Sequence, residues 1–242
     1  MRLRKVIGML FGWIIPPPKP PKKSKQKLLE ERQEKIKWLR TNGFLMSKTI
    51  EDAMLKVPRE HFVPLFYRDH TYEEMPFPLP GKNSTISCPH SYPLFYEALS
   101  LAPGQNFLEI GTGSGYGAVL AAEVVGSLGR VTSVEIDYET FQYAQKRMKK
   151  FNYSNLFLIK GDGGEGYPPH APYDKICLTV ACTEIPPPLI NQLKEGGKLI
   201  TPLGSPRITQ DLVLLEKGKE GKINTQILEK VLYVSLQGIY GK

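Results

Sequence analysis

The amino-acid sequence predicts an α/β fold: a doubly wound, largely parallel sheet with helices before it and antiparallel strands at its end. Two observations carry this prediction. Short apolar strand patterns alternate with amphipathic helix patterns from about residue 93 onward, and a glycine-rich turn (GTGSG, 111–115) joins one of these strands to the following helix. Strands that alternate with helices form parallel sheets covered by helices. The composition, 41% hydrophobic and 23% charged over 242 residues, is ordinary for a water-soluble globular protein.

The positive charge of the chain is concentrated at its beginning. The net charge is +8, and eight basic residues precede the first acidic residue, Glu30. The remaining 24 basic residues equal the 24 acidic residues in number, so the rest of the chain is formally neutral. A nucleic-acid groove on the folded body is therefore not favoured, since such grooves require clustered basic residues.

We expect residues 1–27 to form a basic tail with an apolar part. The apolar run VIGMLFGWII (6–15) is followed by PPPKPPKKSKQK. Ten residues are too few to span a bilayer, which takes about 20. Polyproline follows in place of the small-residue cleavage site of a signal peptide. Two alternatives stay open: contact with an anionic membrane surface, or packing on the protein's own body or a protein partner.

Residues 28–103 are expected to hold N-terminal helices and a long ordered loop that forms the acceptor site. Three apolar residues can share one face of a first helix over 28–43: Leu29, Ile36 and Leu39. A second helix is expected to start near Thr49. The segment 57–93 is rich in proline and turn-forming residues, and loops of this kind often carry function.

Residues 104–242 are expected to form the α/β core. Strands are predicted at 106–110, 130–136, 156–160, 175–180 and 197–202. Helices are predicted at 93–101, 116–125, 140–151 and 188–193. Two last segments, 212–216 and 227–236, are predicted to be antiparallel strands.

The glycine-rich turn predicts a ligand site at the end of the first core strand. In FLEIGTGSGYG (107–117), Glu109 lies near the strand end, and Gly111, Gly113 and Gly115 lead into the helix. Glycines let the backbone turn tightly and approach a ligand where a Cβ would collide. The spacing is GxGxG and differs from the GxGxxG of dinucleotide binders.

Two further carboxylates strengthen the prediction of a nucleoside site. Glu135 ends the second core strand and can accept hydrogen bonds from both ribose hydroxyls, and Asp162 follows the third strand and can accept one from an adenine amino group. Parallel strands bring their carboxyl ends to one edge of a sheet, where open α/β sheets bind ligands. The chain has no Walker loop. A ligand with adenosine but no phosphates, S-adenosyl-L-methionine, fits these features.

The sequence also resembles the protein-L-isoaspartate (D-aspartate) O-methyltransferase family, which implies a Rossmann-like class I methyltransferase fold. The likeness is close over 51–204 and looser over the last forty residues. It rests on these blocks: VPREHFVP (57–64), YEEMPFPLPGKNSTISCPH (72–90), FLEIGTGSGYGAVLA (107–121), VEID (134–137), GDG (161–163), APYDKICLTVAC (171–182) and PPLINQLKEGGKLITPLG (187–204). The TIS-x-PH block together with the glycine loop is specific for that family.

The resemblance implies roles for individual residues. Thr85, Ile86 and Ser87 would close over the cofactor and bind the acceptor, with Ser87 as the active-site serine and Thr85 beside it. The expected cofactor-binding residues are Ile86, Glu109, Gly111, Thr112, Gly113, Gly115, Glu135, Asp162 and Gly163. Arg59, in the VPRE block, would either pair with an acid or lie near the acceptor.

The implied activity is methyl transfer from S-adenosylmethionine to the α-carboxylate of L-isoaspartyl residues, with D-aspartyl residues as further candidates. The partners would be damaged peptides and proteins, repaired through a succinimide. A carboxylate, with a pKa near 4, is already ionised at neutral pH. Transfer of a methyl group to it therefore requires positioning and desolvation, and no general base.

Cysteine and histidine near the serine support no other chemistry. Cys88 and His90 would need two more ligands to hold a metal, and none is apparent, so no metal is expected. A covalent Cys88 intermediate has no use in this reaction. The triplet Ser91-Tyr92-Pro93 departs from the family pattern, which puts the acceptor geometry in doubt. The chain has three cysteines, an odd and sparse set that favours a reducing, cytoplasmic compartment.

Competing functions are a nucleic-acid methyltransferase, a methyltransferase for another peptide carboxylate, and a non-enzymatic relative. Enzymes that methylate amino groups of nucleic acids carry an Asn/Asp-Pro-Pro-aromatic turn after the fourth strand, and TVACTEIPPPL (179–189) lacks it. No core motif looks disabled, which disfavours a non-enzymatic role. The glycine spacing excludes an NAD-linked oxidoreductase.

Overall fold

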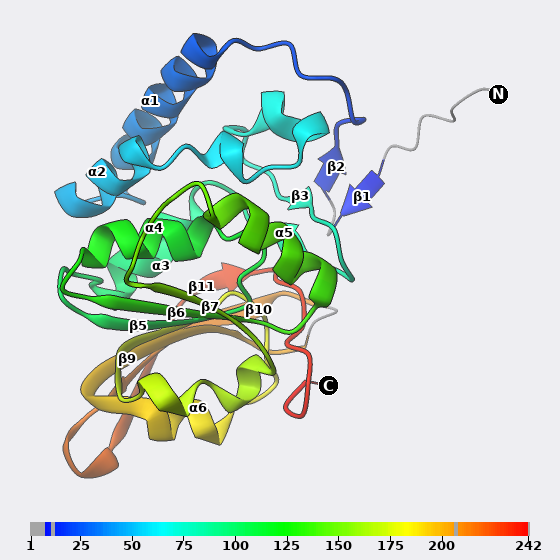
Figure 1. Ribbon diagram of the computed structural model, residues 1–242. Coiled ribbons are helices and arrows are strands. Elements are labelled where there is room, and N and C mark those ends of the chain that lie inside the picture. The colour runs from blue at the N-terminus through cyan, green and yellow to red at the C-terminus, as the bar shows by residue number, and fades with distance from the viewer. Residues whose placement is uncertain (1–7, 11–12, 206–207, 242) are drawn as a thin grey trace.

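A seven-stranded sheet forms the centre of the molecule in the computed structural model, which describes residues 8–10, 13–205 and 208–241 (Figure 1). The strand order is β11-β10-β9-β8-β5-β6-β7. The strands are β5 (Asn106–Ile110), β6 (Arg130–Glu135), β7 (Leu156–Lys160), β8 (Tyr173–Leu178), β9 (Leu193–Leu203), β10 (Gln210–Lys217) and β11 (Ile223–Val231). Strands β5 to β9 pair in parallel, and β10 is antiparallel to both of its neighbours. The predicted doubly wound α/β sheet is confirmed.

Helices cover both faces of this sheet (Figure 1). One face carries α3 (Ser91–Leu99), α4 (Tyr116–Val125) and α5 (Tyr138–Met148), and the other carries α6 (Pro187–Gln192). Helix α4 is apolar on nearly all sides, with residues 116–122 buried, because it lies between the sheet and the N-terminal helices.

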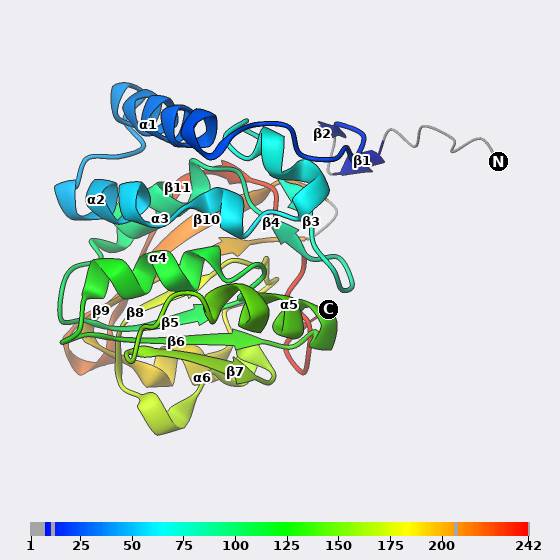
Figure 2. The same ribbon diagram turned by 45° about the horizontal axis from the view of Figure 1, so that its top comes forward.

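The N-terminal helices lie on the far side of α3 and α4 from the sheet (Figures 1 and 2). They are α1 (Lys25–Thr41) and α2 (Lys48–Lys56), and α2 packs on α4. Helix α1 begins earlier than predicted because the Ser24 hydroxyl accepts a hydrogen bond from the Lys27 N–H at 3.1 Å. The buried face consequently uses Leu28, and Leu29 is 37% exposed, which corrects the predicted helix face.

The boundaries of other elements also shift by a few residues. Helix α2 begins after Ser47, two residues before the expected Thr49. Helix α3 starts at Ser91, and α5 starts after Asp137, whose side chain caps it. The last strand, expected at 227–236, spans Ile223–Val231, and the residues that follow it turn toward the carboxyl ends of the parallel strands.

The loop predicted between residues 57 and 93 contains short ordered elements. Two 3-10 helices, η1 (Arg59–His61) and η2 (Leu65–His70), are followed by a small hairpin of β3 (Phe77–Pro78) and β4 (Thr85–Ile86). This hairpin lies beside the N-terminal part of α5 (Figure 2).

The tail packs on the body where the structure describes it; residues 1–7 and 11–12 lie outside the described residues. The chain forms a short hairpin of β1 (Gly8–Leu10) and β2 (Trp13–Ile15), and Ile15 is buried. The Lys19 N–H donates to the Phe66 carbonyl at 3.0 Å, and the backbone N–H groups of Lys22 and Lys23 donate to Asp69. Part of the tail therefore packs on the protein's own body, which was one of the two alternatives.

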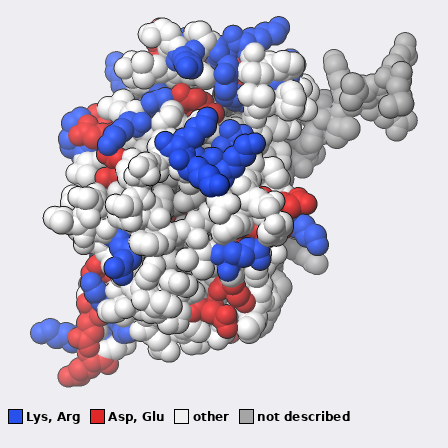
Figure 3. Space-filling model, in the orientation of Figure 1, with Lys and Arg blue, Asp and Glu red and all other residues white. Residues whose placement is uncertain are grey.

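Charged side chains of both signs are mixed on the face seen in Figure 3, with one group of Lys and Arg near its middle. The sequence KRMKK (146–150) has four cations in and just after the last turn of α5. Cations at a helix C-terminus complement the helix dipole. Within the described residues, no helix combines the length and the apolar character needed to cross a bilayer.

Candidate active site

The site lies at the carboxyl end of β5, between its two neighbouring strands. Strand β5 pairs in parallel with β6 on one side and with β8 on the other. Their carboxyl ends border an open cavity whose empty volume, open solvent included, is about 760 Å³. The cavity therefore occupies the switch point at which doubly wound sheets bind ligands.

The glycine turn forms the floor of this cavity. Gly111 has φ +90° and Gly113 has φ +56°, in the region that favours glycine. A Cβ on Gly111 would come within 2.7 Å of the Thr179 hydroxyl oxygen. Gly115 also has a positive φ, but it faces Met148 and does not line the cavity. The turn thus exposes backbone to the cavity through Gly111, Thr112 and Gly113.

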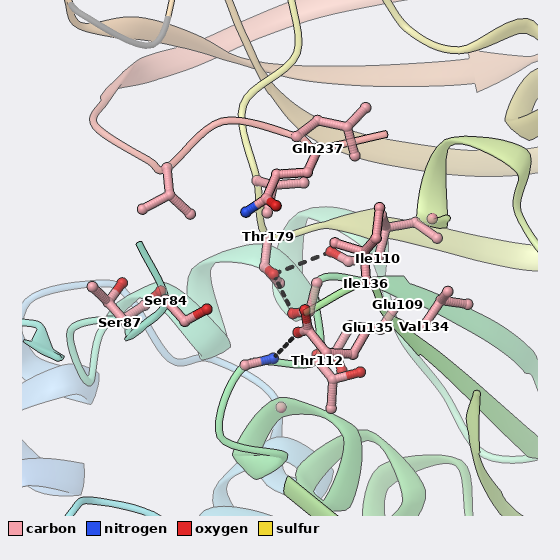
Figure 4. A pocket seen from close by; sticks show the side chains of 18 of the residues that line it. Ser84, Ser87, Glu109, Ile110, Thr112, Val134, Glu135, Ile136, Thr179 and Gln237 are labelled. Carbon is pink, nitrogen blue, oxygen red and sulfur yellow. Dashed lines mark hydrogen bonds between the residues drawn. The ribbon is translucent and has the colours of Figure 1, made fainter. Parts of the chain in front are cut away.

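Glu135 reaches the cavity from the end of β6. One carboxylate oxygen accepts a hydrogen bond from the Gly113 N–H at 3.0 Å, and the other accepts from the Asp137 N–H at 3.0 Å. These bonds fix the carboxylate at the cavity wall, where Figure 4 shows it beside Thr112 and Ile136. Burial raises the pKa of Glu135, while the two backbone donors lower it.

Glu109 lies deeper, on β5. Its Oε2 accepts from the Ser133 hydroxyl at 2.6 Å, and Ser133 in turn contacts the Thr112 hydroxyl at 2.6 Å. Burial raises the pKa of Glu109 to about 8. Gly117 leaves room for this carboxyl group, because a Cβ there would lie 2.3 Å from Glu109 Oε1.

The loop with the predicted catalytic serine closes the opposite side. Figure 4 shows Ser84 and Ser87 across the cavity from Val134 and Glu135. The Thr140 hydroxyl anchors the hairpin at 2.8 Å from both the Pro80 carbonyl and the Ser84 hydroxyl. Thr85 and Ser87 line the cavity, and Ile86 between them is fully buried in the core, since neighbouring side chains of an extended strand point to opposite faces.

Asp162 is adjacent to the cavity wall, which is formed there by Gly163. Its Oδ1 accepts from the Gly164 N–H at 2.9 Å, and its Oδ2 accepts from the Ile239 N–H at 2.7 Å. Both carboxylate oxygens thus hold backbone together in this structure. The residues predicted for the site that line the cavity are Thr85, Ser87, Glu109, Gly111, Thr112, Gly113, Glu135 and Gly163, and those that do not are Ile86, Gly115 and Asp162.

Several lining residues were not predicted. Thr179 follows β8, and its hydroxyl donates to the Gly111 carbonyl at 2.6 Å; its position at a strand end was the available signal. Tyr92 and Ser84 come from the acceptor loop, and residues 234–237 come from the segment after β11. No local pattern marks 234–237. They reach the site because the Ala181 N–H donates to the Val234 carbonyl and the Leu236 N–H donates to the Ala181 carbonyl, both at 2.7 Å.

Glu74 is the third member of a cluster with Cys88 and His90. Their ligand atoms lie within 4.8 Å of one another. Glu74 already accepts from Lys35 at 3.0 Å and pairs with His90 at 2.6 Å, and burial raises the pKa of the Cys88 thiol to about 11. Glu74 and His90 therefore belong to an ion-pair network with Lys35, and the Cys88 thiol beside them is protonated.

The residues present fit S-adenosylmethionine. Among the described residues, the cavity wall contains two carboxyl groups, Glu109 and Glu135, and no Lys, Arg or His. Such a wall suits a ligand that carries positive charge and lacks phosphates. The approach of glycine backbone and the carboxylate at the end of β6 suit a nucleoside. Fold and site together define a class I S-adenosylmethionine-dependent methyltransferase.

Comparisons with known proteins narrow this class to one family. The sequence model of the protein-L-isoaspartate(D-aspartate) O-methyltransferase family matches residues 30–240. The chain belongs to this family.

The chain matches curated proteins of the corresponding name over nearly their whole length. The chain is 39% identical over 214 residues to the protein-L-isoaspartate O-methyltransferase of Methanothermobacter thermautotrophicus, covering 88% of this chain and 98% of that protein. It is 43% identical over 206 residues to the enzyme of that name from Methanococcus aeolicus, covering 85% and 94%.

Solved structures agree in fold. A protein-L-isoaspartate O-methyltransferase superposes with a TM-score of 0.78 at 31% identity, over 87% of this chain and 67% of that chain. A candidate enzyme of the same name from Plasmodium falciparum, solved with S-adenosyl-L-homocysteine, superposes with a TM-score of 0.74 at 24% identity, over 89% and 99%.

Proposed function

We propose that this chain methylates the free α-carboxylate of L-isoaspartyl residues in damaged peptides and proteins, and that D-aspartyl residues are further acceptors. The family of the chain and the names of its relatives support the L-isoaspartyl acceptor. Attack of the main-chain nitrogen on the resulting ester expels methanol and gives a succinimide, which water can open to normal aspartate.

This proposal rests mainly on one observation: two cavities meet at Thr85 and Ser87. A second open cavity, with an empty volume of about 930 Å³, shares Thr85, Ser87 and Val234 with the donor cavity. Its wall combines apolar residues such as Phe44, Leu94 and Val231 with polar and charged residues such as His90, Glu229 and Lys230. A peptide held in this second cavity presents its carboxylate at Ser87, facing the methyl donor.

Ser87 and Thr85 position the acceptor. Hydroxyl groups can donate to one oxygen of a carboxylate and leave the other oxygen free to react. When bound, S-adenosylmethionine supplies an electrophilic methyl group, which forms a bond to the carboxylate oxygen as the electron pair of the broken bond stays on sulfur. No proton is transferred, so the chain needs no general base. Glu109 and Glu135 hold the cationic and ribose parts of the cofactor.

A pair of peptides tests the acceptor. An isoaspartyl peptide and its normal aspartyl twin are assayed for methyl-ester formation with wild type, Ser87→Ala and Ser127→Ala, the last an exposed control in the turn after α4. We expect methylation of the isoaspartyl peptide alone. Loss of the Ser87 hydroxyl should lower kcat/KM by about tenfold or more, as loss of a hydrogen bond to a charged group does, with unchanged binding of S-adenosylhomocysteine. Equal methylation of the two peptides would refute the proposed acceptor.

For the tail, we infer contact with an anionic membrane surface. Ile14, Leu65 and Phe66 are 69%, 53% and 54% exposed. The Pro-Lys segment lies beside them, because the Lys19 N–H donates to the Phe66 carbonyl. Apolar side chains next to several lysines are typical of interfacial binding.

Vesicle co-sedimentation tests this surface. Wild type should sediment with phosphatidylserine vesicles and stay in solution with phosphatidylcholine vesicles. A Leu65→Ser/Phe66→Ser variant should lose sedimentation, whereas Leu128→Ser, a control at a residue 91% exposed elsewhere, should keep it. Equal sedimentation of the double variant and wild type would rule out this surface.

A further inference from the structure

Arg59 is a buried cation whose hydrogen bonds go to backbone carbonyls. The residue, in η1, is 2% exposed. Its Nε donates to the Thr71 carbonyl at 3.0 Å, and its Nη2 donates to the Ser87 carbonyl at 2.6 Å. Nη1 is buried and has no hydrogen-bond partner among the described residues. In the part of the chain that the structure describes, none of the ion pairs includes Arg59.

The carboxyl groups of this region are engaged elsewhere. Glu60 pairs with Arg32 at 2.6 Å, and Glu74 pairs with Lys35 at 3.0 Å. Glu109 is buried on β5 and accepts a hydrogen bond from the Ser133 hydroxyl at 2.6 Å. A buried charge without a counter-charge is strongly destabilising. Arg59 therefore stands beneath the acceptor loop as a charge that none of the described carboxylates balances.

Two aromatic rings flank the guanidinium. Its Cζ lies 5.6 Å from the ring centroid of Tyr92 and 5.5 Å from that of Tyr116, within cation–π range. Tyr92 also lines the donor cavity beside Ser87. Since Arg59 itself is buried, its influence on a bound acceptor passes through Ser87 and Tyr92 and through the electrostatic potential.

We propose that Arg59 is the positioning residue that selects an ionised acceptor: it holds the Ser87 backbone and supplies a positive potential that is balanced when the acceptor carboxylate binds. This inference rests on the proposed function. It makes the site discriminate by charge, because methylation converts the anionic carboxylate into a neutral ester. The unbalanced cation attracts the substrate and has no such attraction for the product, so the ester is released.

The test compares an isoaspartyl peptide with an analogue whose α-carboxyl group is a carboxamide. The KM of the first peptide, the Ki of the analogue and the Kd of S-adenosylhomocysteine are measured for wild type, Arg59→Met, Arg59→Lys and the control Arg32→Met. We expect wild type to prefer the carboxylate by about tenfold or more, the scale of one desolvated charge interaction.

Arg59→Met should lose this preference by raising KM, with Ki and Kd within about twofold of wild type, and Arg59→Lys should restore part of it. Arg32→Met removes a cation that is paired with Glu60 and Tyr72, so it should lower the melting temperature and keep the preference. A folded Arg59→Met enzyme with the wild-type preference would overturn the inference. If that variant does not fold, equal affinity of wild type for the two peptides overturns it. Failure of wild type to methylate the isoaspartyl peptide would instead refute the proposed function.

Discussion

At the residue scale, the donor cavity depends on carboxyl groups held in unlike environments. Glu135 accepts from two backbone N–H groups, whereas Glu109 accepts from the Ser133 hydroxyl in a fully buried position. Desolvation raises the pKa of both groups, and that of Glu109 reaches about 8. One acid can therefore change its charge near neutral pH, where cofactor binding takes place.

Binding of the cationic cofactor should follow the ionisation of Glu109. A positive ligand favours the carboxylate form, so affinity for S-adenosyl-L-methionine, with its sulfonium charge, should rise as pH increases through about 8, with proton release at pH 7. Calorimetry in buffers of different ionisation enthalpy measures both effects. Glu109→Gln should flatten the pH dependence, and the exposed control Glu220→Gln should retain it. A pH-dependent Glu109→Gln variant would contradict this assignment.

The same group predicts how stability changes with pH in the ligand-free protein. Because the folded-state pKa of about 8 is above the usual 4.5, the folded state holds a proton that the unfolded state releases. This contribution to the free energy of unfolding is complete below pH 4.5 and is lost as pH rises through about 8. The melting temperature of wild type minus that of Glu109→Gln should therefore fall between pH 5 and pH 8.5. A constant difference would speak against the raised pKa.

At the element scale, the β3–β4 hairpin connects the two cavities and is anchored by one hydroxyl. Thr140, buried in the first turn of α5, contacts the Pro80 carbonyl and the Ser84 hydroxyl. Asp137, the cap of α5, also accepts from the Lys82 N–H of this hairpin at 3.4 Å, so α5 helps to set the position of Thr85, while Arg59 holds the Ser87 carbonyl.

Thr140→Val should loosen this hairpin. Loss of the hydroxyl leaves polar groups without a partner and should cost about 1–3 kcal/mol in free energy of unfolding. The KM values for cofactor and peptide should both rise, because the hairpin borders both cavities. Denaturant unfolding and steady-state kinetics measure these effects, with the exposed Thr225→Val on β11 as control. Wild-type kinetics in a destabilised variant would show that the anchor does not govern the site.

The elements were predictable where the signal is local. Strand β5, strand β7 and helix α4 have the predicted limits, because apolar periodicity and flanking glycines define them within a few residues. Helix α1 and strand β11 start at other residues than predicted, since a serine cap and pairing with β10 decide their limits. The strand-end rule led to Glu135, and the same rule applied to β8 would have led to Thr179.

At the scale of the whole molecule, the N-terminal segment is an addition to a core that contains both cavities. Residues 15–23 contact the body through Ile15, Phe66 and Asp69, and none of them lines a cavity described above. The proposed division at 1–27, 28–103 and 104–242 therefore treats the tail as separable from catalysis.

Deletion of residues 1–23 should lower the melting temperature, because it removes the buried Ile15 and the bonds to Phe66 and Asp69. It should leave kcat/KM for an isoaspartyl peptide within about twofold, since the described residues of this segment line neither cavity. Thermal denaturation and the methyl-ester assay test this. Loss of activity in a folded deletion variant would instead give the tail a role in the site. Methylation of RNA or DNA by either form would contradict the prediction that nucleic acid is not a substrate.

The sequence by itself determined the alternation of strands and helices, the glycine turn and the edge of the sheet at which Glu109 and Glu135 meet. These features depend on residues close together in the chain, on apolar periodicity and on the geometry of parallel strands. Only the tertiary structure decided that Asp162 binds the backbone of Ile239 and that residues 234–237 line the cavity. It alone also decided that Arg59 donates to the Ser87 carbonyl with no acidic partner among the residues that the structure describes. Each of these depends on segments far apart in the chain meeting in space, which no local pattern records.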